Sequence, residues 1–485
     1  MLAVFQRIDR ENKLTVASAL WIHWWNAIVV LRPAFSRQRT FLWFIVCVAG
    51  MSVRSDNLGV SSIVRALGLD ERFYDNLLDC YHSTGIKLSR LSALWTRTVL
   101  SLFGEKIARV NGRPVLLADG KKNAKEGKKM PGVKSLHQDS ESNTKPSFIM
   151  GHSTQAVAVL ARAASTFFAV PLDIKIHEGL IFSNRDKRTL LDKLLNLVNN
   201  LKLNEPCYLV ADAYYASGKM VKGTLAQGHD LVTRAKSNCV AYSPLPAPRG
   251  KRPPGRPKLY GKKLKLSNLF RSTLKVSEIP SPVYDEKGIM IRVRCCDLLW
   301  RPAGRLVRFV LVEHPTRGRL ILMCSDLQLD AVQIIRLYGL RFKIELGFKQ
   351  AAHVIGTFDY HFWMMDMKPL KRRNGNQHLH RESEAYRCAV RRKLNAYHIF
   401  LFTGVVAQGL MHYLSSCHTD LVWRSFGSWL RTVRKGVAPS EMVVTMALRN
   451  TLSEFLLVCS GTNIMAKFIE ERQDRSRADF FGKAA

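Results

Sequence analysis

Leu116-Leu-Ala-Asp119-Gly is the stretch of sequence that decides the fold. A short apolar run ends there in a single aspartate, and Tyr208-Leu-Val-Ala-Asp212 repeats the pattern later in the chain. Short apolar runs bounded by glycine and polar residues are typical of buried strands. The two aspartates are therefore predicted to stand at the ends of neighbouring strands of one sheet.

A third carboxylate lies in Tyr338-Gly-Leu-Arg341-Phe-Lys-Ile-Glu345. Apolar residues recur here at intervals of three and four, which predicts a helix from Asp330 to Phe348. Tyr338, Arg341 and Glu345 are spaced three and four apart, so they are expected to share one stripe of that helix.

The order of predicted elements indicates an α/β core with a mixed sheet. At 485 residues the chain is long enough for two or more domains. The predicted parts are an all-helical region at 1–110 and a first part of the core at 111–237. A basic linker and β-rich insertion at 238–326, a second part of the core at 327–415 and C-terminal helices at 416–485 follow.

Within the helical N-terminal region, residues 60–78 predict a helix, a turn at Gly68 and a second helix after Asp70. This is the spacing of a helix-turn-helix, in which the second helix enters the major groove of DNA. A packed helical pair without a DNA contact has the same pattern, so both interpretations stay open.

The charge balance predicts a dense anionic partner. Lys and Arg number 74 against 38 Asp and Glu, for a formal net charge of +36. Nucleic acid is the first candidate and a membrane surface the second. The apolar run Ala396–Leu414 is long enough to span a membrane, but His398, Gln408 and His412 interrupt it, which favours a buried helix.

Two basic segments are candidate phosphate contacts. Lys121 and Lys122 open a lysine-rich run beside Asp119, expected to be a mobile cationic loop; a solvated charge run is the alternative. The second segment contains Arg252, Arg256 and Lys258, and its Gly-Arg-Pro core resembles an AT-hook. A basic linker would have the same composition.

Three carboxylates in a basic chain suit two-metal phosphoryl chemistry, in which ions about 3.5–4 Å apart steady the attacking and leaving oxygens. Asp119 could contact both ions, with Asp212 and Glu345 each completing one. Hard oxygen ligands favour Mg²⁺ (or Mn²⁺), and the ten scattered cysteines contain no Cys-x-x-Cys pair for zinc. The scattered cysteines indicate reduced thiols in a cytosolic compartment. In the alternative interpretation the aspartates only end strands and Glu345 pairs with Arg341.

These motifs resemble DDE-type insertion-sequence transposases, the cut-and-paste group with an RNase H-like catalytic core. The resemblance covers roughly residues 55–460 and is carried by Asp119 and Asp212 in their strand contexts. Its most specific part is Tyr338-x-x-Arg341-x-x-x-Glu345, which looks like the Tyr-Arg-Glu-Lys signature of the group. The group also has a β-rich insertion before the glutamate.

The resemblance implies nicking at the ends of an element, then attack of the freed 3′-OH on target DNA, with Asp119, Asp212 and Glu345 holding Mg²⁺ (or Mn²⁺). It also implies double-stranded DNA with terminal inverted repeats as partner, a homodimer that pairs two ends, a bacterial cytoplasm close to the nucleoid, and no membrane. Arg341 and Tyr338 would contact DNA.

One position departs from the pattern. The signature has a lysine seven residues after the glutamate, where this chain has Ala352; Lys349 could contact the phosphate instead. A catalytically impaired, transposase-derived DNA-binding protein and a metal-dependent nuclease are therefore the alternatives. A basic peripheral membrane protein is a third.

Overall fold

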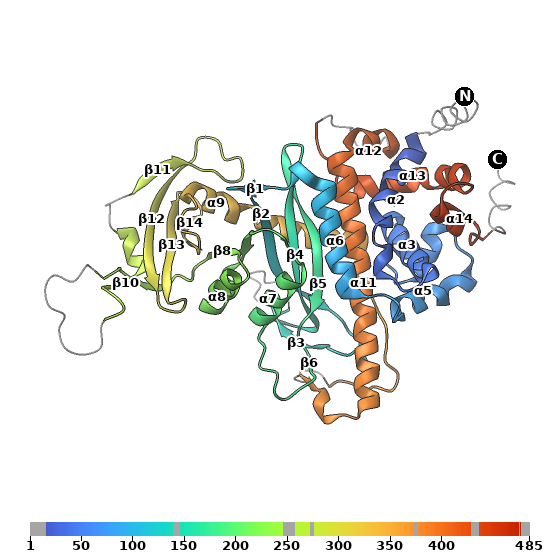
Figure 1. Cartoon of the computed structure of the whole chain (residues 1–485), viewed down its shortest axis with the longest axis horizontal. Coiled ribbons are helices and arrows are strands. Elements are labelled where there is room, and N and C mark those ends of the chain that lie inside the picture. The colour runs from blue at the N-terminus through green and yellow to red at the C-terminus, as the bar shows by residue number, and fades with distance from the viewer. Residues whose placement is uncertain are drawn as a thin grey trace.

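The structure is a computed structural model of the chain. It describes residues 16–138, 146–245, 258–271, 276–371, 376–427, 436–474 and 476. A large mixed sheet forms the middle of the molecule, and a helical body lies at one end of it (Figure 1).

Five strands form the centre of the sheet. They are β2 (Arg113–Ala124), β4 (Phe148–Ala163), β5 (Thr166–Ile176), β7 (Tyr208–Ala211) and β8 (Asp230–Arg234). Their order across the sheet is β5-β4-β2-β7-β8; β4 runs antiparallel to β2 and β5, whereas β7 and β8 run parallel to β2. This is the strand order and direction of an RNase H-like core, so the predicted fold class is confirmed.

Helices cover both faces of this centre. Helices α7 (Leu190–Asn200) and α8 (Gly218–Ala226) lie on one face, and α9 (Ala331–Leu340) and α10 (Phe342–Gln350) lie on the other. Successive side chains of a strand point to opposite faces. Accordingly Leu116 belongs to the apolar cluster that contains α7 and α8, whereas Leu117 belongs to the cluster with α9 and Ile344.

The β-rich insertion continues the same sheet. Its strands are β9 (Val240–Tyr242), β10 (Lys263–Lys265), β11 (Ser277–Pro280), β12 (Met290–Trp300), β13 (Arg305–His314) and β14 (Gly318–Cys324). Strand β14 pairs antiparallel with β8, Cys324 opposite Val232. The insertion is therefore joined to the core by backbone hydrogen bonds, and Figure 1 shows it as the outer part of the sheet.

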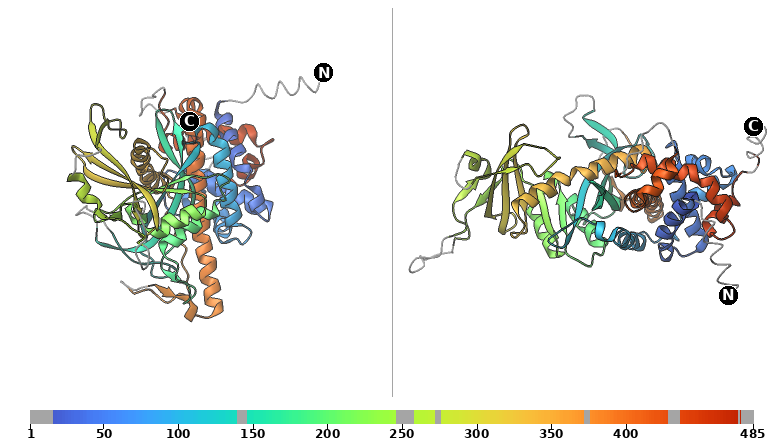
Figure 2. Two further views of the ribbon diagram at one scale, coloured as in Figure 1. Left: turned by 60° about the vertical axis from the view of Figure 1, so that its left-hand side comes forward. Right: turned by 90° about the horizontal axis from the view of Figure 1, so that it is seen from above.

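Helices from the two ends of the sequence form one body. The N-terminal ones are α2 (Val16–Val29), α3 (Gln38–Val53), α4 (Ser61–Leu67), α5 (Tyr74–His82) and α6 (Leu88–Phe103). The C-terminal ones are α11 (Glu384–Cys417), α12 (Thr419–Phe426), α13 (Glu441–Cys459) and α14 (Ile464–Glu470). Trp21 in α2 donates to the Leu448 carbonyl of α13 at 3.1 Å, and both views of Figure 2 show these helices side by side.

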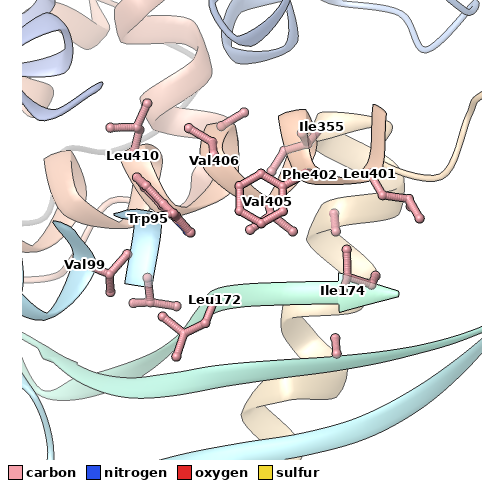
Figure 3. Packing of buried hydrophobic residues seen from close by; sticks show 14 of the residues in the cluster. Trp95, Val99, Leu172, Ile174, Ile355, Leu401, Phe402, Val405, Val406 and Leu410 are labelled. Atoms are coloured by element: carbon pink, nitrogen blue, oxygen red, sulfur yellow. The ribbon is translucent and has the colours of Figure 1, made fainter. Parts of the chain in front are cut away.

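Helix α11 is the link between this body and the sheet. It packs along β5, with Leu401 and Val405 near Leu172 and Ile174, while Trp95 of α6 fills the gap beside Leu410 (Figure 3). The Trp95 indole donates to the Pro171 carbonyl of β5 at 3.0 Å. The helical body is thus attached to the sheet edge through a dry apolar interface.

By length and composition α11 and α13 could each cross a membrane. However, 94% of the apolar window of α11 is buried inside the protein, and 56% of that of α13. The buried helix expected for the run that contains His398 and His412 is therefore confirmed.

Two helical predictions are wrong in detail. The segment Asp330–Phe348 is two helices that meet at Arg341, because α9 ends at Leu340 and α10 begins at Phe342. Residues 384–417 are one helix of 34 residues, where the sequence pattern predicts one helix near residues 382–393 and another over Ala396–Leu414. Apolar periodicity does not show a break that is made by one residue, or a continuation through a polar stretch.

The lysine-rich run after Asp119 is not a free loop. Strand β2 continues to Ala124, because its residues pair with β4, and β3 (Lys134–His137) pairs with the same strand. Lys125 is buried, and its ammonium group bonds to the carbonyls of Phe358 and Tyr360. The prediction of a loop is therefore wrong for residues 121–124, whereas residues 125–133 connect β2 to β3 without helix or strand. The short strands β1 (Arg109–Val110), β6 (Leu180–Ile181) and β15 (Gln377–His378) complete the fold.

Candidate active site

Asp119 and Asp212 lie side by side on neighbouring parallel strands. Ala118 of β2 is the register partner of Ala211 of β7, so the next residue on each strand is the aspartate. Asp119 lies within β2, opposite Ala156 of β4, and Asp212 caps the short 3-10 helix Ala213–Tyr215. Register alone thus brings together the two acids that the sequence identified.

Backbone hydrogen bonds orient both carboxylates. The Gly120 N–H donates to Asp119 Oδ1 at 2.7 Å, and the Tyr214 N–H donates to Asp212 Oδ1 at 3.0 Å. The Thr233 hydroxyl on β8 donates to the Asp212 carbonyl at 2.7 Å, which fixes the backbone of the second acid. The side chains are therefore held before any ligand binds.

The electrostatics of the pair favour a bound cation. Burial, followed by the charge of Asp212, raises the pKa of Asp119 to about 7. Burial also raises the pKa of Asp212, and the charge of Glu345 adds to it. Two carboxylates that resist ionisation together gain most from a positive charge placed between them.

Arg341 supplies such a charge in this structure. One of its guanidinium nitrogens lies 3.2 Å from Asp119 Oδ2 and another lies 2.6 Å from Glu345 Oε1. The break between α9 and α10 falls at this residue, so its side chain points from the helix junction to the sheet. Arg341 therefore bridges the strand acid and the helix acid.

The three acids do not form a closed metal site in this structure. Among the residues that the structure describes, no three His, Cys, Asp or Glu side chains converge closely enough to hold one ion, and Arg341 contacts both Asp119 and Glu345. The donors are nevertheless all carboxylate oxygens, which suit Mg²⁺ or Mn²⁺. Two of them are half-buried, and the charge of Asp212 raises the pKa of Asp119 further after burial. This donor set fits a hard divalent cation.

A cavity of about 500 Å³ opens beside the paired aspartates. It is lined by Asp119, Gly120, Lys121, Lys122, Gln138, Ser153, Thr154, Gln155, Leu190, Asp212, Tyr214 and Tyr215. Lysine, amide, hydroxyl and carboxylate side chains around one opening are suited to a phosphodiester and its neighbouring nucleobases. The predicted residues Lys121 and Lys122 therefore lie at the site.

The other predicted DNA contacts are distributed unevenly. Tyr338 is half-buried beside Arg341, whose guanidinium carbon lies 5.8 Å from the centre of its ring. Lys349 is exposed in the last turn of α10. Lys258 lies next to β10, at the opposite end of the sheet from β2. Arg252 and Arg256 lie outside the described residues.

Sequence reasoning missed the roles of Gln155 and of the tyrosine pair. Gln155 Nε2 on β4 donates to the Tyr215 hydroxyl at 2.9 Å, and Tyr214 exposes 56% of its surface at the mouth of the cavity. The two tyrosines follow Asp212 directly, which is a usable signal. Gln155 could not be found, because its place depends on the register of β4 with β2.

Ala352 lies where the helix geometry changes. Residues 351–355 form a π-helical turn after α10, and Ala352 is half-buried against the core. Its carbonyl accepts from the Asn57 side chain at 3.3 Å. A residue at this position faces the helical body, so Ala352 fills a packing role here.

The segment predicted as a helix-turn-helix has the expected turn between α4 and α5, but the exposed face of α5 is acidic. Gly68 ends α4 in the left-handed conformation, and Asp70 caps the short 3-10 helix before α5. The exposed residues of α5 include Asp75 and Asp79. Both would repel phosphates from the helix that would have to enter a groove.

The strand order defines an RNase H-like fold, in which Asp119 and Asp212 stand side by side at a cavity of the sheet. A family model described as Transposase DDE domain matches residues 165–357, which include Asp212 and Glu345 and begin after Asp119. Over these residues the chain is therefore similar to the DDE-type transposases.

Comparison with solved structures gives seven matching chains. One is described as a cryo-EM structure of the piggyBac transposase synaptic complex with hairpin DNA. It is 11% identical, with a TM-score of 0.39, over 90% of this chain and 73% of that one. No curated protein matches the sequence.

Proposed function

We propose that this protein is the transposase of an insertion sequence, which cuts DNA at the ends of the element and joins the freed 3′-OH to target DNA. The observation that carries the proposal is the register of β2 and β7, which places Asp119 beside Asp212 at the cavity, with Arg341 joining Asp119 to Glu345. The alternative, in which the aspartates only end strands and Glu345 pairs with Arg341, accounts for the Arg341–Glu345 ion pair. It does not account for the contact of Arg341 with Asp119, beside Asp212 at one cavity.

In the proposed mechanism Asp119, Asp212 and Glu345 would hold Mg²⁺ or Mn²⁺, which when bound would supply activation of the attacking oxygen and stabilisation of the leaving oxygen of the phosphodiester. Arg341 leaves its carboxylate partners and clamps a phosphate through its planar fork. Lys121 and Lys122 offset the negative charge of the DNA backbone, and Tyr214 contacts a base or sugar next to the cut.

DNA with terminal inverted repeats, a homodimer that pairs two ends and a nucleoid-associated, cytoplasmic setting in a bacterium belong to the same proposal. Because α5 exposes Asp75 and Asp79, we propose that end recognition by residues 1–110 uses a surface other than this helix. Deleting residues 1–110 would remove part of the shared core, so point variants are the appropriate test.

The test is cleavage of a duplex that carries the repeats flanking the gene, in Mg²⁺ buffer. We expect strand breaks at the repeat ends, lost in Asp212→Asn and Glu345→Gln at unchanged DNA affinity. Equal cleavage by these variants would refute the assignment of the acids.

Binding of the repeats without cleavage by the wild type would instead support a catalytically impaired, transposase-derived DNA-binding protein. Ala352 in the place of the signature lysine is the observation that favours this second candidate. Cleavage without joining, at sites unrelated to the repeats, would indicate a metal-dependent nuclease.

A further inference from the structure

The helix that carries Glu345 is weakly anchored by apolar packing. Of the nine residues of α10, Ile344 alone is fully buried, and the Glu345 side chain is 53% exposed. Polar contacts do the remaining positioning. Lys343 Nζ donates to the Thr166 hydroxyl of β5 at 2.8 Å, beside the first turn of the helix.

A second polar contact holds α10 behind Glu345. Gln408 Nε2 of α11 donates to the Gly347 carbonyl at 2.9 Å. That carbonyl already accepts from the Ala351 N–H within the helix, so the bond from Gln408 is additional. It reaches α10 in the turn that follows Glu345, just before the helix widens into the π turn.

One turn after Gln408, His412 fastens α11 to its neighbours. Glu441, at the start of α13, accepts from His412 Nε2 at 2.9 Å, and both side chains are buried. Burial opposes ionisation of Glu441, but the hydrogen bond from His412 counteracts burial, and the pKa of Glu441 is lowered. The His412 ring stacks on Phe168 of β5, with centres 4.5 Å apart.

Gln408, His412 and Glu441 therefore connect three helices with the catalytic sheet. Helix α11 is held by the apolar interface of Figure 3, so the donor at Gln408 has a rigid support. The Gly347 carbonyl already has a hydrogen bond within α10, so α10 can form without the additional bond from Gln408. That bond is suited to fixing the direction of the helix.

We propose that Gln408 is a positioning residue that sets the place of Glu345 relative to Asp119 and Asp212. The inference rests on the proposed function of these three acids as ligands of one metal site. It adds a role for helix α11, whose residue Gln408 acts on the site through the backbone of α10.

The test compares Gln408→Met with Thr403→Val. Methionine keeps the length of Gln408 and removes the donor, and Gly347 keeps its bond within the helix. Thr403 is a matched control, because it is buried in the same helix and its hydroxyl bonds only to the Ile399 carbonyl, at 2.8 Å, among the described residues.

The first readout is local and independent of turnover. Fe²⁺ bound in place of Mg²⁺, with ascorbate and peroxide, cuts a polypeptide near its metal ligands. We expect cuts near residues 119, 212 and 345 in the wild type and in Thr403→Val. In Gln408→Met the cut near residue 345 should weaken, while the other two remain.

The second readout is the Mg²⁺ concentration for half-maximal cleavage of repeat DNA. Loss of one hydrogen bond should raise it about threefold to tenfold in Gln408→Met, and displacement of a ligand should lower cleavage about tenfold or more. DNA affinity should be unchanged.

The outcomes separate the inference from the function on which it rests. Three equal cuts and an unchanged Mg²⁺ midpoint in Gln408→Met overturn the role of Gln408 and leave the metal site intact. A wild type without cuts near the three acids overturns the metal site, and this inference with it. If Thr403→Val changes both readouts as much as Gln408→Met does, the effect is general loosening of α11, and the inference also fails.

Discussion

Replacing Asp119 with asparagine should make the metal-free protein more stable above pH 7 while it abolishes cleavage. In the folded chain, burial and then Asp212 raise the pKa of Asp119 from 3.8 to about 7. A carboxyl group with a raised folded pKa adds stability below its unfolded pKa, and this stability is lost as the pH rises through the folded pKa.

The size of the effect follows from the shift. Each pKa unit corresponds to about 1.4 kcal/mol, so about three units give roughly 4 kcal/mol as an upper bound. Asparagine keeps the shape and the acceptor for the Gly120 N–H, but it never ionises. The free energy of unfolding of the variant should therefore exceed that of the wild type by up to about 4 kcal/mol at pH 8. The two free energies should converge near pH 4.

The assay is thermal unfolding of both proteins in EDTA at pH 8 and pH 5, followed by titration with Mg²⁺ at pH 8. We expect a higher Tm for Asp119→Asn at pH 8, a smaller difference at pH 5, and a rise of Tm with Mg²⁺ in the wild type only. A variant less stable than the wild type at pH 8, or a difference independent of pH, would refute the reasoning.

Three other predictions concern the scaffold around the site. Lys125→Met leaves two buried carbonyls without their donor and should cost about 1–3 kcal/mol, measured as a lower urea midpoint. Gly218→Val should destabilise by about 1–3 kcal/mol or more, because an added Cβ would lie 2.1 Å from the Pro302 carbonyl oxygen. Gly461→Ala, with nothing within 4 Å of its added Cβ, is the control and should unfold like the wild type. Burial lowers the pKa of His152 to about 4, so its share of stability, about 3 kcal/mol, is present above pH 6.5 and lost as the pH falls towards 4. His152→Gln should show a smaller drop in Tm between pH 7 and pH 5 than the wild type does.

The aspartate pair could be predicted because each acid ends a short apolar run, and such runs become buried strands. Which strands become neighbours is a long-range property, and the chain between β2 and β7 contains β3 to β6 as well as α7. The prediction of neighbouring strands came from the repeated pattern of an apolar run that ends in an aspartate. The sequence therefore predicted the essential geometry of Asp119 and Asp212. It did not predict that β2 continues past Asp119, because that continuation depends on pairing with the distant strand β4.

Lys125 illustrates the limit of composition. In the sequence it belongs to a lysine-rich run with the character of a solvated loop. In the fold its ammonium group is buried against the carbonyls of Phe358 and Tyr360, more than two hundred residues away. Burial also lowers the pKa of this lysine to about 8. No local pattern identifies such distant acceptors.

The predicted proximity of Arg341 and Glu345 was correct, but the prediction of one continuous helix that contains both residues was wrong. The break at Arg341 turns its side chain towards Asp119, an ion pair that a straight helix with a shared stripe does not predict. The support behind α10 was invisible for another reason. Gln408 interrupts an apolar run, where its polarity indicated only a buried helix, and its partner Gly347 has no side chain to reveal the contact.

The central claim is that Asp119, Asp212 and Glu345 act as ligands of one metal site. The most direct test is cleavage of repeat DNA by Glu345→Cys in Mg²⁺ and in Mn²⁺. A thiolate is a poor ligand for the hard Mg²⁺ ion and a better one for a softer transition metal. We predict no cleavage in Mg²⁺ and partial recovery in Mn²⁺; equal activity, or equal inactivity, in both metals would contradict the claim.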